Sequence, residues 1–208
     1  MIYIVFDTET TGLDIRHASL KEVCSISNNG DEVIQIGGLT LDSNLNPIKA
    51  FCHYCDCLKH ASDGKAFKTH QLDLATIRRY VPNTYLEDVL VTYLPEFFEE
   101  DVVFIGYNVK FDINMVAQSI RNSSLEWGPF QNVKAKLPRE GRWQLDVMDF
   151  LPRRMQLVSY ETSLREARTK FYKEFQGRLP LETNCPELLS EHWQRAHHAL
   201  YDSIQTYL

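Results

Sequence analysis

A short apolar run at the start of the chain, Ile2 to Phe6, ends directly at the acidic triplet Asp7-Thr8-Glu9. The run is rich in strand-forming residues and is followed by a polar turn at Gly12, which predicts a buried strand. Later segments alternate between strand-like and helix-like patterns. We expect further strands over 33–41, 47–57, 102–105 and 143–147, and helices over 86–97, 111–120, 163–175 and most of the last twenty residues. This interleaving predicts an α/β fold with a mixed sheet.

The helix expected over 86–97 has its own start and break signals. Thr84 and Glu87 have the spacing of a capping box, and the apolar residues that follow recur at helical intervals. Pro95 lies inside the same pattern, and we expect it to kink or split the helix.

The length of 208 residues favours one domain with insertions, because a domain usually holds about 150 residues. The chain has no run of 18 apolar residues, and its first residues lack the basic region and cleavage site of a secretion signal. A membrane or secreted protein is therefore not expected. Five cysteines, an odd number, argue for the reducing cytoplasm rather than a disulfide framework.

The charge of the chain is unevenly distributed. The formal net charge is -6, but residues 134–178 hold eleven Lys and Arg against six Asp and Glu. This segment therefore carries +5 and the remainder -11. A basic segment in an otherwise acidic chain is compatible with binding of a phosphate backbone, and equally with a solvated helical face.

Asp7 and Glu9 lie two residues apart at the end of the first expected strand, so their side chains project from the same face. Two adjacent carboxylates repel each other and raise one pKa unless a cation lies between them. The carboxyl end of a strand in an α/β protein is a place where a hard metal ion binds. The alternative is a solvated strand end, because Asp-x-Glu is a common pattern.

Three short motifs occur along the chain, each beside an expected element. They are Phe6-Asp7-Thr8-Glu9-Thr10-Thr11-Gly12-Leu13, then Asn108-Val109-Lys110-Phe111-Asp112, and then His197 with Asp202 five residues later. Together they resemble the motifs of the DnaQ-like, or DEDDh, 3′-to-5′ exonucleases, which include the proofreading epsilon subunit of bacterial DNA polymerase III. The resemblance covers nearly the whole chain. It implies an RNase H-like fold with a mixed five-stranded sheet flanked by helices, and a single exonuclease domain over 1–208.

The resemblance also implies a metal site. Asp7, Glu9, Asp112 and Asp202 would hold two divalent ions, with Asp7 bridging both. Carboxylate oxygens suit Mg²⁺ or Mn²⁺ better than zinc. Two ions about 3.5–4 Å apart activate water, neutralise the phosphate and assist the leaving oxygen, which are the requirements of phosphodiester hydrolysis.

A histidine is the expected general base, because imidazole titrates near working pH. The family pattern assigns this role to His197. Residues five apart on a helix lie about 140° apart, so His197 can serve Asp202 only from a position before the helix begins. His198, four residues before Asp202, is the alternative.

The resemblance places six residues near the terminal nucleotide: Thr10, Thr11, Gly12, Leu13, Asn108 and Phe111. Leu13 matches the position that wedges beside the terminal base, with a core position as the alternative. Asn108 is expected to orient the turn or the substrate. Phe111 is expected to stack on a base or to pack beneath Asp112. Asp146 resembles an acid that supports the site in the family, although capping of a structural element is the favoured role.

The segments near 14–31 and 176–195 are longer than the family pattern and are interpreted as insertions. We expect the substrate to be the 3′ end of single-stranded DNA, because the first motif looks like that of the proofreading proteins, and a polymerase is a candidate partner. An exoribonuclease that acts on RNA ends or short oligoribonucleotides is the alternative, since the motifs do not show contacts to a 2′-hydroxyl. A non-catalytic module that binds nucleic acid or a polymerase is a third hypothesis, distinguished by the absence of metal-dependent turnover.

The segment from Phe51 to His60 contains cysteine and histidine spacings that are typical of zinc ligands. It also fits the third expected strand, in which Cys55 and Cys57 would share a face with His53 while Cys52 would point away. No second Cys-x-x-Cys pair occurs elsewhere in the sequence. Buried reduced thiols are therefore favoured over a zinc site.

Overall fold

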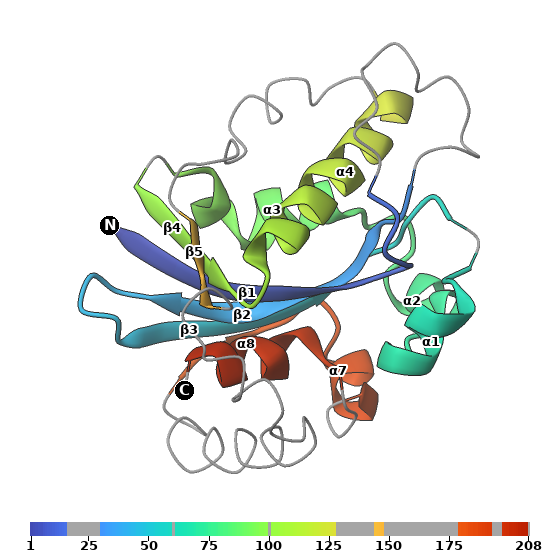
Figure 1. The fold of residues 1–208 in the computed structure, drawn as a ribbon. Coiled ribbons are helices and arrows are strands. Elements are labelled where there is room, and N and C mark those ends of the chain that lie inside the picture. Colours follow the sequence, from blue (N-terminus) through green and yellow to red (C-terminus); the bar gives the residue numbers. More distant parts are fainter. Residues whose placement is uncertain are drawn as a thin grey trace.

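The computed structural model describes residues 1–15, 30–59, 61–99, 101–127, 144–147, 179–192 and 197–207. Within these residues six strands form one sheet in the order β5-β4-β1-β2-β3-β6 (Figure 1). The strands are β1 (Ile2–Thr10), β2 (Val33–Leu41), β3 (Pro47–Tyr54), β4 (Val102–Gly106), β5 (Gln144–Asp146) and β6 (Leu181–Glu182). β2 pairs antiparallel with β1 and β3, whereas the three other pairings are parallel. The predicted α/β class with a mixed sheet is confirmed.

β1 and β6 differ from the sequence prediction, and β3 ends at Tyr54 rather than at Cys57. β1 continues to Thr10 because β2 pairs with it along its whole second half, so the acidic triplet lies inside the strand rather than at its end. The prediction of five strands is wrong, because β6 forms in a segment that the sequence analysis does not assign to a strand. β6 pairs only Leu181 and Glu182 with β3, and two residues are too few to produce an alternating pattern.

Helices cover both faces of the sheet (Figure 1). α3 (Leu86–Tyr93) and α4 (Val109–Trp127) lie on one face, and α8 (Ala199–Tyr207) lies on the other, close to α7 (Pro186–His192). The short helices α1 (Gly64–His70) and α2 (Leu74–Tyr80) follow β3 and lie near the end of β1. None of the helices in the described ranges has the length and apolar character needed to cross a membrane.

Each face of the sheet has its own apolar core. Phe6 packs edge-on against Phe97 and Phe104 on the face of α3 and α4. Its neighbour Val5 belongs to the other core, which includes Leu200 of α8. Because side chains alternate along a strand, Asp7 and Glu9 follow Val5 onto the face of α8.

The start of α3 differs from the predicted capping box by one residue. Tyr85 is the residue before the helix, and its backbone N–H donates to Asp88 Oδ2 at 3.0 Å. Thr84 instead accepts a backbone hydrogen bond from Asp56 at 2.7 Å, which keeps it outside the helix. The predicted effect of Pro95 is confirmed, since α3 ends at Tyr93 and a separate 3₁₀ turn runs over Pro95–Phe98. The helix expected over 163–175 lies outside the described residues.

Candidate active site

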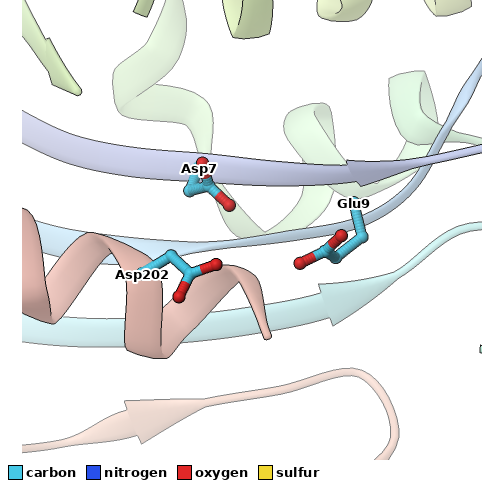
Figure 2. A group of neighbouring side chains, drawn as sticks. All are labelled: Asp7, Glu9 and Asp202. Carbon is cyan, nitrogen blue, oxygen red and sulfur yellow. The ribbon is translucent and has the colours of Figure 1, made fainter. Parts of the chain in front are cut away.

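Three carboxyl groups from two elements converge beside β1. Asp7 and Glu9 extend from β1 and Asp202 from the first turn of α8, and each offers an oxygen within 4.8 Å of the other two. Figure 2 shows the three groups facing a common space between strand and helix. In the described part of the chain no other group of His, Cys, Asp and Glu side chains has this geometry. The structure therefore brings together three of the four predicted metal ligands, and we refer to them as the acidic cluster.

Residues of β2 seat α8 close enough for Asp202 to meet the side chains of β1. Gly37 lies under the start of the helix, where a Cβ would be 2.3 Å from a backbone nitrogen of α8. The buried Gln35 accepts a hydrogen bond at its Oε1 from the Ala199 N–H at 3.0 Å. The Ser203 hydroxyl lies 2.8 Å from the Gly37 carbonyl and 2.7 Å from the Ala199 carbonyl, so it is shared between β2 and its own helix. A glycine and two polar contacts thus set the position of the helix that carries Asp202.

Asp112, the fourth predicted ligand, lies in the first turn of α4 and is held by Thr8. Its Oδ1 accepts hydrogen bonds from the Thr8 backbone N–H at 3.0 Å and from the Thr8 hydroxyl at 2.7 Å. The negative charge of Asp112 raises the pKa of both Asp7 and Glu9, so its carboxylate is a neighbour of the acidic cluster.

Burial and mutual repulsion favour the protonated form of these carboxyl groups. Burial raises the pKa of Asp7 and of Glu9 well above their ordinary values, and the surrounding carboxylates raise it further. Burial also raises the pKa of Asp112 to about 7, against the opposing hydrogen bonds from Thr8. Full ionisation of such a cluster at neutral pH requires a cation beside it.

The donor set fits a hard divalent cation. Every member of the acidic cluster offers a carboxylate oxygen, which is the ligand type preferred by Mg²⁺ and Mn²⁺. A divalent ion would displace the protons that burial and repulsion retain on Asp7 and Glu9, so metal binding is expected to release protons.

His197 and His198 occupy different environments. His197 lies before α8 with a left-handed backbone (φ 53°), its side chain is half-buried, and burial lowers its pKa. It therefore meets the condition that the sequence spacing sets for a general base. His198 is buried in the core, with Nε2 at 3.5 Å from the Tyr54 hydroxyl and 3.7 Å from Cys52 Sγ. These contacts favour a packing role for His198.

The loop after β1 uses its hydroxyl groups internally. Thr10 donates its hydroxyl proton to the Gly12 carbonyl at 2.7 Å, and the buried Thr11 donates to Asp31 Oδ1 at 2.9 Å. Leu13 is 77% exposed, so the alternative of a core position is wrong. The loop therefore offers the Leu13 side chain, rather than the two hydroxyl groups, to a ligand.

A buried carboxylate, Asp31, fixes the same loop. It forms an ion pair with the Lys59 ammonium, and its Oδ2 accepts a hydrogen bond from the Asp14 N–H at 2.8 Å. A Cβ on Gly12 would lie 2.4 Å from Asp31 Oδ2, so a larger residue at this position would displace the carboxylate. The hydrogen bonds of Asp31 and the charge of Lys59 lower the Asp31 pKa despite its burial, which keeps this carboxylate ionised.

The second motif forms the turn between β4 and α4. Asn108 has a left-handed backbone (φ 61°), and its N–H donates to Asp146 Oδ1 at 2.9 Å. The Asn108 carbonyl accepts the Phe111 N–H at 2.8 Å, and Phe111 packs against the core on the face of α3 and α4. The hydrogen bond to Asn108 agrees with the favoured capping role of Asp146, and the charge of Asp146 also raises the pKa of Asp112, so its role as a supporting acid stays a prediction. The position of Phe111 agrees with the packing alternative.

The cysteine-rich segment forms the end of β3 and the turn after it. Cys52 and Cys57 belong to the core on the α8 face, whereas Cys55 belongs to the core on the opposite face. The prediction that Cys55 and Cys57 share a face is wrong, because the regular strand ends at Tyr54. All three are buried free thiols whose pKa is raised by burial, in agreement with the favoured alternative to a zinc site.

Four positions that shape the site were missed by sequence reasoning: Thr8, Asp31, Gln35 and Gly37. Thr8 lies between the two acidic residues of β1, and strand alternation alone directs it to the opposite face, where the second motif packs. Adjacent glycines at 37 and 38 within a strand are a recognised signal of close backbone approach. No pattern in the sequence pairs Asp31 with Lys59.

The sequence matches a family model. The model of the exonuclease family RNase T matches residues 4–136, a range that contains the first and second motifs. The match spans more than half of the chain, and the chain therefore belongs to this exonuclease family, the DnaQ-like family that its motifs resemble. No curated protein matches the sequence. The closer resemblance to the epsilon subunit stays a prediction.

Solved structures of exonuclease I share the fold. Exonuclease I from Methylocaldum szegediense aligns with a TM-score of 0.53 and 16% identity over 99% of this chain and 38% of that one. E. coli exonuclease I in complex with a dA16 oligonucleotide aligns with a TM-score of 0.51 and 17% identity over 99% and 39% of the two chains. This chain thus spans about two fifths of the length of these proteins. The predicted RNase H-like architecture is confirmed.

Proposed function

We propose that this protein is a 3′-to-5′ exonuclease that releases nucleoside 5′-monophosphates from the 3′ end of single-stranded DNA, using two Mg²⁺ or Mn²⁺ ions. The observation that carries the proposal is the convergence of Asp7, Glu9 and Asp202 within 4.8 Å in a chain of the exonuclease family. Bound divalent ions would supply charge neutralisation at the phosphate and activation of water.

The residues of the chain divide the remaining work. Asp7, Glu9 and Asp202 hold the ions, and Asp112 adds the fourth carboxylate in an orientation maintained by Thr8. His197 accepts a proton from the attacking water, and its lowered pKa keeps the imidazole neutral and able to do so at pH 7. Of the six residues expected near the terminal nucleotide, the exposed Leu13 and Asn108 are proposed to contact it. Thr10, Thr11, Gly12 and Phe111 are proposed to hold the two turns that carry these contacts.

Single-stranded DNA is the favoured substrate. Two of the similar E. coli exonuclease I structures are complexes with dA16 and dT13 oligonucleotides, which supports this choice. An RNA end is the alternative substrate, and the matched structures lend no support to a polymerase partner.

We also propose that residues 1–208 form a single exonuclease domain with insertions near 14–31 and 176–195, and that the protein acts in the cytoplasm, where its buried free thiols stay reduced.

Matched single-stranded DNA and RNA oligonucleotides with 5′ labels test the proposal. In Mg²⁺ or Mn²⁺ the protein is expected to produce a descending ladder, faster on DNA, and EDTA is expected to abolish it. Asp7→Asn keeps the side-chain shape but removes the charge and is expected to abolish the ladder, as is His197→Ala. Intact binding without any ladder on either strand would contradict the enzymatic proposal, whereas a faster ladder on RNA would replace DNA by RNA as the substrate.

A further inference from the structure

Hydrogen bonds join both ends of α1 to the residues that follow Asp7 and Glu9 in the chain. Before the helix, the Asp63 backbone N–H donates to the Thr11 carbonyl at 2.7 Å. At the last helical residue, His70 Nε2 lies 3.1 Å from the Thr10 carbonyl, and His70 Nδ1 accepts the Leu72 N–H at 2.9 Å. Nδ1 therefore carries no proton in the neutral ring, and Nε2 donates. Because Thr10 directly follows Glu9, the helix lies beside the acidic cluster.

The outer part of α1 combines an aromatic ring with positive charges. Phe67 is 46% exposed, and Lys65 and Lys68 are also exposed. One exposed phenylalanine is common on a protein surface. This one lies three residues before His70, about 60° from it around the helix, so it borders the side of α1 that contacts Thr10. No carboxylate of the described residues forms an ion pair with either lysine.

Leu13 continues the same surface. The loop packs directly on the start of α1, since a Cβ on Gly12 would lie 2.8 Å from Asp63 Oδ2. Leu13 follows with 77% of its surface exposed. α1 itself contains no acidic residue, and the Asp63 carboxylate accepts the backbone N–H groups of Lys65 and Ala66. An apolar surface that carries two lysines against the one carboxylate of Asp63 therefore borders the acidic cluster.

We propose that this surface of α1 binds the single strand just upstream of the terminal nucleotide, with one base stacked on Phe67 and one phosphate beside the Lys68 ammonium. The inference rests on the proposed function, because the acidic cluster defines where the strand ends. Aromatic rings stack on any base, and a lysine beside the backbone neutralises one phosphate. Around the helix, Lys68 lies about 100° from Phe67 and Lys65 about 160°, so Lys65 points away from the stacked base.

Two substrates separate this surface from the acidic cluster. The p-nitrophenyl ester of thymidine 5′-monophosphate occupies the cluster alone, whereas a single-stranded dT oligonucleotide also extends upstream. Phe67→Ala is expected to raise the KM for the oligonucleotide about tenfold and to leave hydrolysis of the ester within about twofold of the unchanged protein. Phe67→Trp is expected to retain the oligonucleotide KM, because it keeps an aromatic face.

Lysine variants test the phosphate contact. Lys68→Ala is expected to reduce the slope of log affinity against log salt concentration by about 0.7 for a dT strand, and Lys65→Ala to reduce it less. Val91→Ala is the matched control, because it truncates a side chain of equal exposure on α3. It is expected to change neither the KM for the oligonucleotide nor the hydrolysis of the ester.

Three results would overturn the surface proposal. They are an unchanged oligonucleotide KM in Phe67→Ala, an equal loss of activity on the oligonucleotide and the ester in Phe67→Ala, or equal salt slopes for the two lysine variants. Hydrolysis of neither substrate by the unchanged protein would instead overturn the proposed function. In that case, anisotropy of a labelled dT strand still tests the surface, because weaker binding by Phe67→Ala than by Val91→Ala would support it and equal binding would overturn it.

Discussion

Thr8 shows how one residue links two of the three motifs. It lies between Asp7 and Glu9 in β1, and its hydroxyl donates to Asp112 Oδ1 at 2.7 Å from the other side of the strand. Contacts of this kind orient metal ligands without touching the metal. The position of Asp112 thus depends on a side chain that the motif does not single out.

Thr8→Val is expected to raise the Mn²⁺ concentration for half-maximal activity about tenfold, because it removes the hydroxyl donor while it keeps the side-chain shape. Thr8→Ser retains the donor and is expected to behave like the unchanged protein. Metal titrations of oligonucleotide hydrolysis measure both. An identical metal dependence in Thr8→Val would show that the backbone N–H alone holds Asp112.

His53 predicts how stability depends on pH. Its ring is fully buried and stacked 4.8 Å from the Tyr93 ring, and neither of its nitrogens has a hydrogen-bond partner among the described residues. Burial, with a smaller effect of the Lys49 charge, lowers its pKa from 6.5 to about 3. Between pH 6.5 and about 3, the unfolded chain therefore binds a proton on His53 that the folded chain does not. The free energy of unfolding falls as pH falls below 6.5.

His53→Phe is expected to keep the stacking and to remove this dependence, which is worth about 2 kcal/mol at pH 5. Urea denaturation near pH 7 and pH 5 compares the two proteins. If both lose the same free energy of unfolding between these values, other groups control the acid sensitivity.

At the residue scale, the sequence predicts groups whose chemistry is carried by a motif. Asp7, Glu9 and Asp202 were predicted, and the structure brings them together. Residues that act through a distant partner were missed, as Asp31 with Lys59 illustrates, because their roles depend on contacts that only folding creates.

At the scale of elements, the packing of α8 on β2 decides whether the acidic cluster forms. Gly37→Ala places a Cβ 2.3 Å from a backbone nitrogen of α8, so the helix must shift and carry Asp202 away from β1. We expect a loss of about 1–3 kcal/mol in the free energy of unfolding and a larger relative loss of metal-dependent turnover. Gly64→Ala is the control, because nothing lies within 4 Å of the added Cβ. Full turnover in Gly37→Ala would contradict this role of β2.

The elements predicted correctly are those with long periodic patterns. β2 has the predicted bounds of 33–41, and the helix expected over 111–120 lies within α4. α1 and α2 were not predicted, although an aspartate caps each of them. Each has only seven residues, which is too short to display a clear apolar stripe.

At the scale of the whole molecule, the sheet order brings together motifs that are far apart in sequence. β1 is an inner strand, β4 lies beside it and leads into α4 with Asp112, and β2 on its other side carries α8 with Asp202. The basic segment 134–178 lies outside the described residues except for 144–147. Among the described residues, Lys59 places positive charge on the loop of the first motif through its ion pair with Asp31, and α1 adds the exposed Lys65 and Lys68.

The catalytic role of the acidic cluster is tested most directly with a single-stranded DNA labelled at its 3′ end, as Mn²⁺ is added to the unchanged protein and to Asp202→Asn. We predict that labelled nucleoside 5′-monophosphate is the first product, that its release saturates with Mn²⁺, and that Asp202→Asn is slower by about 100-fold or more. Release of a longer labelled fragment, or an equal rate in Asp202→Asn, would contradict a 3′-end hydrolase built on the acidic cluster.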